Sequence, residues 1–331
     1  MNNHIKQKWA PTISVVTCTY NSKKFLLKAL HSMESQTYPY IEHIINDSFS
    51  TDGSMEMIES YKKRNQSKYP IKVIHTEPHG VAKALNIATN AASGNIIHYL
   101  HSDDYYDRPD ALEQAASYFI NDPDLVWMTG NFYIEFKGEK LIIPHSHLLK
   151  IKPETSISLM NVIHHENTFV KKNAVINYGG FCENKAMNVE YRLWLRLIKD
   201  HKPLVVNNQF TIFIIHQGST STGNIVQFSK AILRGFNTLQ QEKVFPFIGY
   251  YEDKEFFKNF EKIHSSTQKF MSLLLSGDIV NYKWMENHQK LQQIQQKLLP
   301  SNHQIKSLFN RFVFDKIGVK TQKPAISRKD K

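Results

Sequence analysis

The chain of 331 residues has few cysteines and no long apolar run. Its two cysteines, Cys18 and Cys182, are too few for a disulfide framework, which fits a reducing compartment. No stretch approaches the roughly eighteen consecutive apolar residues of a membrane span. The polar residues 1–8 also lack the apolar core of a signal peptide. We therefore expect a cytoplasmic protein.

Two common motifs for phosphate and metal binding are missing as well. No Gly-x-Gly-x-x-Gly or Walker pattern appears, which counts against dinucleotide dehydrogenases and P-loop enzymes. The sixteen histidines are scattered without zinc spacing. In His164-His165-Glu166 the two histidines would point to opposite faces of an expected strand. We therefore expect no zinc site.

Basic residues outnumber acidic ones, and this excess is distributed unevenly along the chain. The net charge is +11, and residues 301–331 carry eight Lys or Arg against two Asp, a local net of +6 that leaves +5 elsewhere. Basic surfaces favour anionic partners such as nucleotides, nucleic acid or acidic lipids. Because the first 300 residues are only mildly basic, no nucleic-acid partner is expected.

Strand and helix patterns alternate through the first third of the chain. Short β-rich runs fall at residues 13–17, 41–45, 71–75 and 96–100, and helical patterns fall at 24–36, 55–64 and 81–92. Asn21 or Ser22 could cap the first of these helices. This alternation predicts an α/β fold with a doubly wound, mostly parallel sheet.

Polar segments follow three of the predicted strands, at residues 17–21, 46–48 and 101–104. In sheets of this kind ligands bind at the carboxyl ends of the strands. We therefore expect the three segments to converge on one edge of the sheet and form a binding site there.

The rest of the chain divides into further units. Residues 111–120 and the apolar segment 189–199 read as helices, and 126–133 reads as a strand. We expect a main domain over 1–224, with halves at about 12–110 and 111–224. A helical extension over 225–300 and a basic amphipathic helix and tail over 301–331 follow.

The adjacent carboxylates Asp103 and Asp104 directly follow an apolar strand. Such a pair is costly unless a cation meets it, and hard ions such as Mg²⁺ or Mn²⁺ take oxygen ligands. A bound cation could also offset the charge on a diphosphate leaving group. The plainer interpretation is that the two residues cap the next helix or solvate a turn.

Three further residues admit both a chemical and a plain structural interpretation. Asp47 could accept a hydrogen bond from a base, or serve a turn. Tyr20 could stack on a base, or pack in the core. Glu190 opens an amphipathic helix, where the macrodipole favours its ionised form. It could accept a proton from a hydroxyl, or have no chemical role.

In their order and spacing these motifs resemble glycosyltransferase family 2, inverting enzymes with the GT-A fold, over residues 12–222. The likeness includes the Thr-Tyr-Asn turn at 19–21 and His-Ser-Asp-Asp at 101–104, where that family has its Asp-x-Asp motif. The matching stretches are residues 12–21, 36–39, 42–47, 50–54, 77–86, 93–97, 100–106, 165–169, 179–181 and 190–195.

The resemblance implies a role for each matching position. Thr17, Tyr20 and Asp47 would hold the base and ribose of a nucleotide-sugar donor, most simply a UDP-sugar. Asp103 would bind the Mg²⁺ or Mn²⁺ and the donor, with Asp104 beside it. Glu190 would be the general base, and one displacement would invert the configuration at the transferred sugar.

The sequence departs from the family at three positions. His101 replaces an acidic residue or Asn, Ser48 replaces a second acidic residue, and Glu190 replaces Asp. The implied product is a bacterial cell-surface polysaccharide or glycolipid, built on a glycan or lipid-linked acceptor. A nucleotidyltransferase would show a glycine-rich loop, which residues 11–21 lack. A catalytically silent nucleotide-sugar-binding or membrane-scaffold protein remains the alternative.

The basic C-terminal segment has an amphipathic pattern. Ile305, Leu308, Phe309 and Phe312 share one helical face over residues 303–319, with basic residues elsewhere. This pattern is typical of peripheral attachment to an anionic membrane surface, here the inner face of the cell membrane. The alternative is a helix docked on the main domain, followed by a disordered polar tail.

Overall fold

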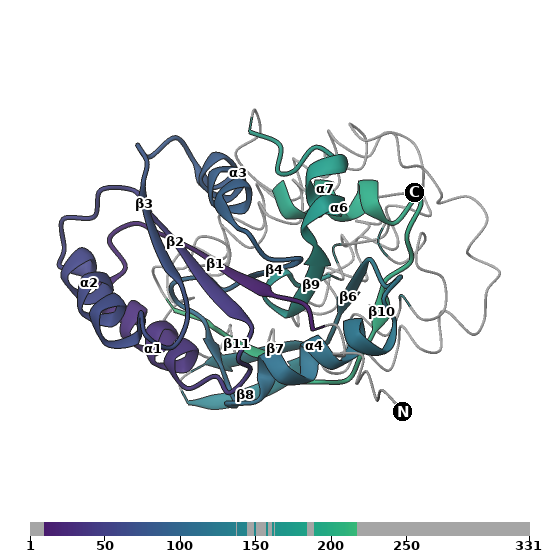
Figure 1. Ribbon diagram of the computed structural model, residues 1–331, viewed down its shortest axis with the longest axis horizontal. Helices are drawn as coiled ribbons and strands as arrows, with labels where there is room; N and C mark the ends of the chain where they lie inside the picture. The colour runs from purple at the N-terminus through teal and green to yellow at the C-terminus, as the bar shows by residue number, and fades with distance from the viewer. Residues whose placement is uncertain are drawn as a thin grey trace, which may run out of the picture.

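The computed structural model describes residues 10–136, 138–143, 149, 157, 161, 163–183 and 189–216 (Figure 1). The expected helical extension over 225–300 and the basic segment over 301–331 lie outside these residues. Within them, no helix combines the length and the apolar character that crossing a membrane requires.

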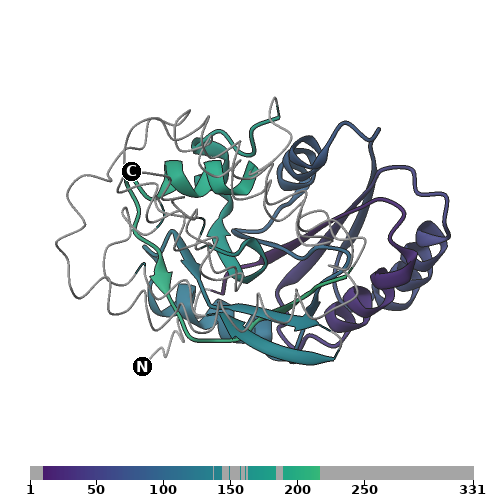
Figure 2. The same cartoon turned by 180° about the vertical axis from the view of Figure 1, so that it is seen from behind.

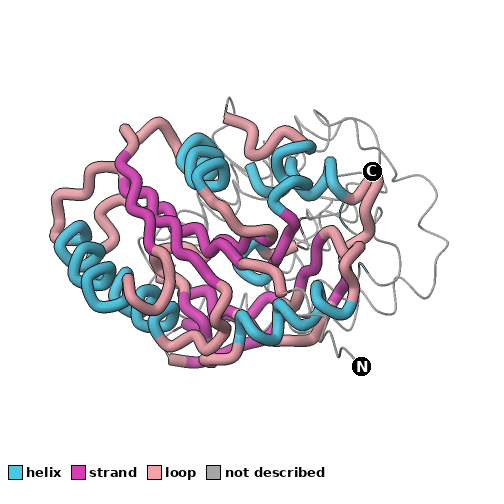
Figure 3. Tube along the Cα trace, in the orientation of Figure 1, coloured by secondary structure: helices cyan, strands magenta, loops and turns pink. Residues whose placement is uncertain are grey.

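A seven-stranded sheet forms the centre of the described chain, in the order β10-β6-β9-β4-β1-β2-β3 (Figure 3). The strands β1, β2, β3 and β4 are parallel, whereas β9 runs antiparallel between β4 and β6. Their bounds are β1 Ile13–Thr19, β2 Ile41–Asp47, β3 Ile71–His75, β4 Ile96–Tyr99, β6 Trp127–Thr129, β9 Thr168–Lys171 and β10 Leu204–Val205. The predicted mostly parallel α/β sheet is confirmed.

Helices cover both faces of this sheet (Figures 1 and 2). On one face lie α1 (Lys23–Glu34), α2 (Ser54–Asn65) and α4 (Ala111–Asn121). On the other lie α3 (Val81–Ala91), α6 (Lys172–Asn177) and α7 (Val189–Leu197). The five helices predicted within the described residues are present, with ends shifted by a residue or two.

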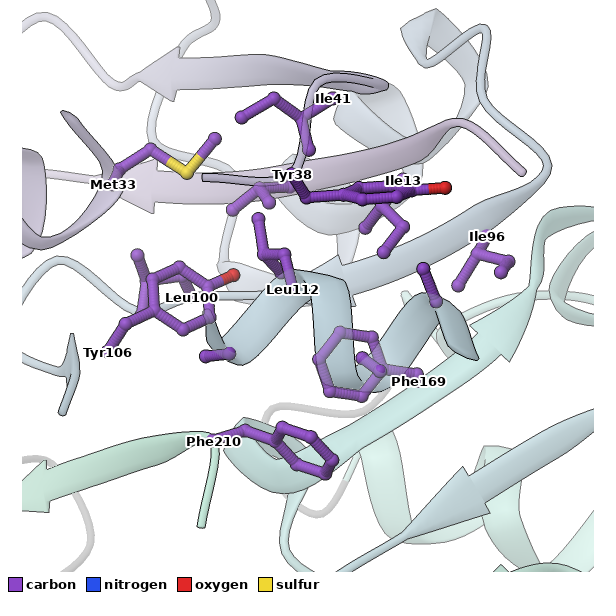
Figure 4. Close-up of a cluster of buried hydrophobic side chains, with 14 of the residues drawn as sticks. Ile13, Met33, Tyr38, Ile41, Ile96, Leu100, Tyr106, Leu112, Phe169 and Phe210 are labelled. Carbon is purple, nitrogen blue, oxygen red and sulfur yellow. The ribbon is translucent and has the colours of Figure 1, made fainter. Parts of the chain in front are cut away.

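The strands are continuous apolar runs because side chains on both faces of the sheet pack into the core. Neighbouring residues of β1 pack into different clusters: Val15 lies with α1 and α4, and Val16 lies with α3 and α7. Figure 4 shows the first of these clusters, in which Ile13 and Ile41 of the sheet lie among side chains of the helices on that face. A sheet buried on both faces has no alternation of apolar and polar residues.

A second sheet of four strands, in the order β5-β11-β7-β8, packs beside the first. Its strands are β5 Tyr105–Tyr106, β7 Phe132–Phe136, β8 Glu139–Ile143 and β11 Thr211–Ile214. The prediction of one strand over 126–133 was wrong, because the segment divides at Gly130 between the two sheets. There the Gly130 N–H donates to the Asn167 carbonyl at 3.0 Å, and a Cβ would lie 3.1 Å from the Asn208 carbonyl oxygen.

Candidate functional site

The three polar segments predicted to converge do meet at one edge of the main sheet. In the parallel register Thr19 lies opposite Asp47, and the Ser48 N–H donates to the Thr19 carbonyl at 3.0 Å. The Thr17 hydroxyl donates to the Leu100 carbonyl at 2.8 Å, which ties the end of β1 to the turn after β4. We call this edge, formed by the carboxyl ends of β4, β1, β2 and β3, the carboxyl rim.

Thr17 and Asp47 are buried, and their polar atoms bond to the protein. The Thr17 hydroxyl also lies 3.0 Å from Nε2 of His43. The Asp47 carboxylate accepts hydrogen bonds from the Ser50 N–H at 2.9 Å and the Ser50 hydroxyl at 2.5 Å. Both residues therefore shape the rim, and their contact with a nucleotide stays a prediction. Tyr20, by contrast, is 57% exposed at the end of β1.

Asp103 is the carboxylate of the pair that reaches solvent. Its side chain is 26% exposed, and Oδ2 lies 3.0 Å from Nε2 of His216. Burial alone would raise the pKa of Asp103, but the hydrogen bond with His216 and the nearby His101 outweigh it and lower the pKa. Asp103 is thus held ionised at the rim.

His216 was missed by the sequence analysis. It follows β11, 113 residues beyond its partner Asp103, and its ring stacks on Phe25 with centroids 3.8 Å apart. Pairing in the small sheet brings it to the rim, and no local pattern predicts that pairing. The only sequence signal is a histidine directly after a short apolar strand.

Asp104 lies beneath Asp103 and is fully buried. Its Oδ1 accepts a hydrogen bond from the Ile214 N–H at 3.1 Å, while Oδ2 has no partner within the described residues. Burial, together with the charges of Asp103 and Glu166, raises its pKa well above the usual range. A cation close by would relieve this accumulation of negative charge.

On its own, the carboxylate pair supplies only part of the coordination shell of a hard divalent cation. In the described part of the chain no three His, Cys, Asp or Glu side chains are grouped closely enough to hold a metal ion. Asp103 is partly exposed and ionised, and the unpartnered Oδ2 of Asp104 is a second oxygen. Mg²⁺ is commonly held by one or two carboxylates, with phosphate oxygens and water in the remaining positions. The donor set fits that pattern.

A cavity of about 170 Å³ opens beside the turn that carries the pair. Residues from distant parts of the chain line it, because α3, α7 and a short 3-10 turn meet there. The polar side chains in its wall are His101, Asn161, His164, His165, Glu166 and Glu190. Two carboxylates therefore face one small space next to Asp103.

Glu190 lies in the first turn of α7, as predicted, and is half-buried. Burial raises the pKa of its carboxyl, and the charge of Glu166 adds to that effect. The macrodipole would favour ionisation, so burial outweighs it here. A carboxylate with a raised pKa is a stronger base, provided that it is still ionised at the working pH.

Glu166 is the second residue that the sequence analysis missed. Residues His165–Asn167 form a 3-10 turn (η2) and not the expected strand, so His164 and His165 both face the cavity. Glu166 Oε1 lies 3.8 Å from His101 Nε2. Burial, with a contribution from the Asp103 charge, raises the Glu166 pKa, although His101 opposes the shift.

A buried histidine holds the turn that carries Glu166. Nε2 of His98 lies 2.9 Å from the Glu166 carbonyl oxygen, and Nδ1 lies 2.7 Å from the Tyr106 hydroxyl. Burial lowers the pKa of His98 to about 3, so its ring is neutral. Since a carbonyl only accepts hydrogen bonds, Nε2 carries the proton.

Comparison with known proteins gives a consistent result. The model of the family described as glycosyl transferase family 2 matches residues 14–182. That range includes Asp47 and Asp103 and ends before Glu190.

Two relatives, both from bacteria, illustrate the similarity. A Bacillus subtilis protein named for teichuronic acid biosynthesis, TuaG, is 34% identical over 113 residues, or 34% of this chain and 43% of that protein. The poly(ribitol-phosphate) β-N-acetylglucosaminyltransferase TarS of Staphylococcus aureus is 28% identical over 156 residues, or 46% and 26% of the two chains. The matched part thus covers less than half of either relative.

Solved structures share the fold. TarS in complex with UDP has a TM-score of 0.54 at 19% identity and covers 84% of this chain and 78% of that one. The mannosyltransferase PcManGT of Pyrobaculum calidifontis, in complex with GDP-Man and Mn²⁺, has a TM-score of 0.57 at 15% identity and covers 92% and 84%. The GT-A-like fold expected from the sequence is confirmed.

Proposed function

The chain belongs to glycosyl transferase family 2, and from this we propose that it moves a sugar from a nucleoside-diphosphate-sugar to a hydroxyl of a glycan or lipid-linked acceptor. The observation that carries the proposal is the arrangement at the carboxyl rim. A partly exposed, ionised Asp103 stands beside a cavity into which Glu190 and Glu166 project.

The donor would lie along the rim with its diphosphate near Asp103. Tyr20 and the turn after Asp47 lie on the next two strands, where the ribose and base would bind. The relative TarS was solved with UDP, and this favours a UDP-sugar as donor.

Asp103, with Asp104 behind it, would hold the Mg²⁺ or Mn²⁺. When bound, the cation supplies a Lewis acid that offsets charge on the departing diphosphate. His216 fixes the Asp103 carboxylate through the 3.0 Å contact. The solved PcManGT, which holds Mn²⁺, supports the presence of a metal in this fold.

Glu190 would act as the general base. It accepts the proton of the acceptor hydroxyl while that oxygen forms its bond to the anomeric carbon. The bond from that carbon to the diphosphate breaks on the opposite side, so the configuration inverts in one displacement. The NMR coupling of the anomeric proton in donor and product tests this step. A product that retains the donor's anomeric configuration would contradict it.

The biological setting follows from the relatives and the charge. TuaG is named for teichuronic acid biosynthesis, so we infer a role in bacterial cell-surface polysaccharide synthesis. We also propose that the protein is cytoplasmic and that its basic residues 303–331 attach it to the anionic inner face of the membrane. The tail should therefore increase cosedimentation with anionic liposomes relative to a chain ending at residue 302. Equal cosedimentation of the two chains would contradict the attachment.

A donor screen tests the proposed function. UDP-, GDP-, CDP- and dTDP-sugars are each incubated with the protein and Mn²⁺, and release of nucleoside diphosphate is measured with and without chelator. We expect metal-dependent release from one donor class. Binding of a donor without release or transfer to any of a broad acceptor panel would favour the silent binding protein.

A further inference from the structure

Two bulky aromatic side chains are exposed at the carboxyl rim. Tyr20 follows β1 and is 57% exposed, and Phe49 follows β2 and is 51% exposed. The Phe49 ring stacks on the exposed His75 at the end of β3, with centroids 5.9 Å apart and planes inclined by 30°. The Thr76 N–H donates to the Asp47 carbonyl at 3.1 Å, which holds these two strand ends together.

The backbone conformation of Phe49 is unfavourable for a bulky side chain, so stability alone does not explain a phenylalanine at this position. Its φ is +58°, in the left-handed region where a bulky residue is rare and glycine is favoured. About half of the side chain faces solvent, so little apolar burial compensates. Glycine would serve this turn better if stability were the only requirement.

The strand order places the Phe49–His75 pair at a definite distance from Asp103. The strands run β4-β1-β2-β3 along the rim, and neighbours in a sheet are about 4.8 Å apart. Phe49 follows the second strand from β4, and His75 ends the third. The pair therefore lies roughly 10 to 14 Å from the strand that leads into Asp103. A nucleoside diphosphate with its phosphates at Asp103 would reach this pair with its base.

We propose that the Phe49–His75 pair is a stacking surface for the nucleobase of the donor. The inference rests on the proposed function, because it takes the occupant to be a nucleoside-diphosphate-sugar. A flat ring offers contact to any base, since every base has a π-face. The pair therefore contributes affinity, while hydrogen bonds elsewhere on the rim would select the base.

Calorimetric titration with UDP, CDP, GDP and dTDP in the presence of Mn²⁺ tests the proposal. For the nucleotide that binds the wild type, Phe49→Gly and Phe49→Ala should each weaken binding about tenfold, as expected when a base loses an aromatic stacking partner. Phe49→Tyr should bind like the wild type. Tyr40→Ala is the matched control, because Tyr40 is 49% exposed at the opposite end of β2.

The melting temperature separates a binding role from a structural one. Phe49→Gly removes the strained conformation, so it should melt at or above the wild-type temperature while binding the nucleotide more weakly. A lower melting temperature would show that the ring supports the turn and would overturn the proposal.

The remaining outcomes are also decisive. Equal nucleotide affinity of wild type and Phe49→Gly, or an equal loss in Tyr40→Ala, overturns the inference and leaves the proposed function standing. Failure of the wild type to bind any of the four nucleotides overturns both. As an independent check, Phe49→Trp should retain affinity, and its emission should be quenched on nucleotide binding.

Discussion

At the scale of single residues, the two carboxyls that face one cavity decide the chemistry. Burial raises the pKa of both carboxyls; the charge of Glu166 adds to the shift at Glu190, and the charge of Asp103 adds to the shift at Glu166. The two residues differ in their surroundings, since Glu166 also lies 3.8 Å from His101. Because Glu166 has this histidine beside it, we expect Glu190 to be the carboxyl that accepts the proton of the acceptor hydroxyl.

Replacing the proposed base tests its role directly. Glu190→Gln should lower kcat by about 10²- to 10⁴-fold, because a general base contributes about that much. The affinity for the donor should be unchanged, since the donor lies along the rim. Glu59→Gln, on the exposed face of α2, is the control. Wild-type kcat in Glu190→Gln would remove Glu190 from the mechanism.

The neighbouring carboxylate should set the pH dependence. Glu190 must be ionised to act, so kcat/KM should fall as the pH drops through its raised pKa. In Glu166→Gln the repelling charge is absent, and the acidic limb of the profile should move to lower pH. An unmoved limb in that variant would show that Glu166 does not influence the base.

The sequence predicted some of these residues better than others. Asp103 and Glu190 stand next to periodic elements, so their places at a strand end and at a helix start could be foreseen. His216 and Glu166 could not, because each depends on a contact made only after folding. The first depends on pairing of the small sheet, and the second on a 3-10 turn in place of a strand.

At the scale of elements, the opposite edge of the sheet carries stability and no chemistry. The buried Glu42 of β2 accepts hydrogen bonds from the Ser14 hydroxyl of β1, from the Ser93 N–H and hydroxyl, and from the Gly94 N–H. It therefore ties β1 and β2 to the turn before β4. Although burial acts to raise the pKa of Glu42, these hydrogen bonds outweigh it and lower the pKa.

Removing this carboxylate should destabilise the fold without affecting the site. Glu42→Ala leaves several buried donors unpaired and should lower the free energy of unfolding by about 3 kcal/mol, measured by urea titration. Glu42→Gln, which keeps one oxygen for three of the donors, should lose less. The donor KM of the folded fraction should stay at the wild-type value. A change in KM would contradict the separation of the two edges.

The lowered pKa of Glu42 determines how the stability of the fold changes with pH. The stabilisation by Glu42 is present above the ordinary glutamate pKa of the unfolded chain and is lost as the pH falls through the lowered folded pKa. The stability difference between wild type and Glu42→Ala should therefore shrink on acidification. A difference that grew as the pH fell would be inconsistent with this linkage.

Element positions were predictable to the extent that periodicity is local. The helices and the four parallel strands follow from patterns within single segments. The division at Gly130 and the antiparallel insertion of β9 between β4 and β6 depend on contacts between distant segments. The spacing of apolar residues along the sequence does not show which distant strands will pair.

At the scale of the whole molecule, the two sheets together build the site. The main sheet brings Asp47 and the turn with Asp103 to one rim, and the small sheet adds His216 from β11. The cavity with Glu190 lies beside that turn. Binding of a nucleotide and a cation at the rim is therefore expected to stabilise the folded protein as a unit.

Thermal unfolding measures this linkage. Mn²⁺ with UDP at about 100 times its Kd should stabilise the wild type by about 2.7 kcal/mol, seen as a higher Tm. Asp103→Asn should lose the Mn²⁺-dependent part of that shift. An equal shift in wild type and Asp103→Asn would mean that the nucleotide binds without the cation at Asp103.

The most direct test is the initial rate of nucleoside diphosphate release, with Mn²⁺, from the donor that the screen identifies. We expect release by the wild type and by Asp124→Asn, whose carboxylate lies in an exposed turn. Release should fall to background level for Asp103→Asn and for the wild type in chelator. Full release by Asp103→Asn, or by the wild type in chelator, would contradict a metal-dependent glycosyltransferase centred on Asp103.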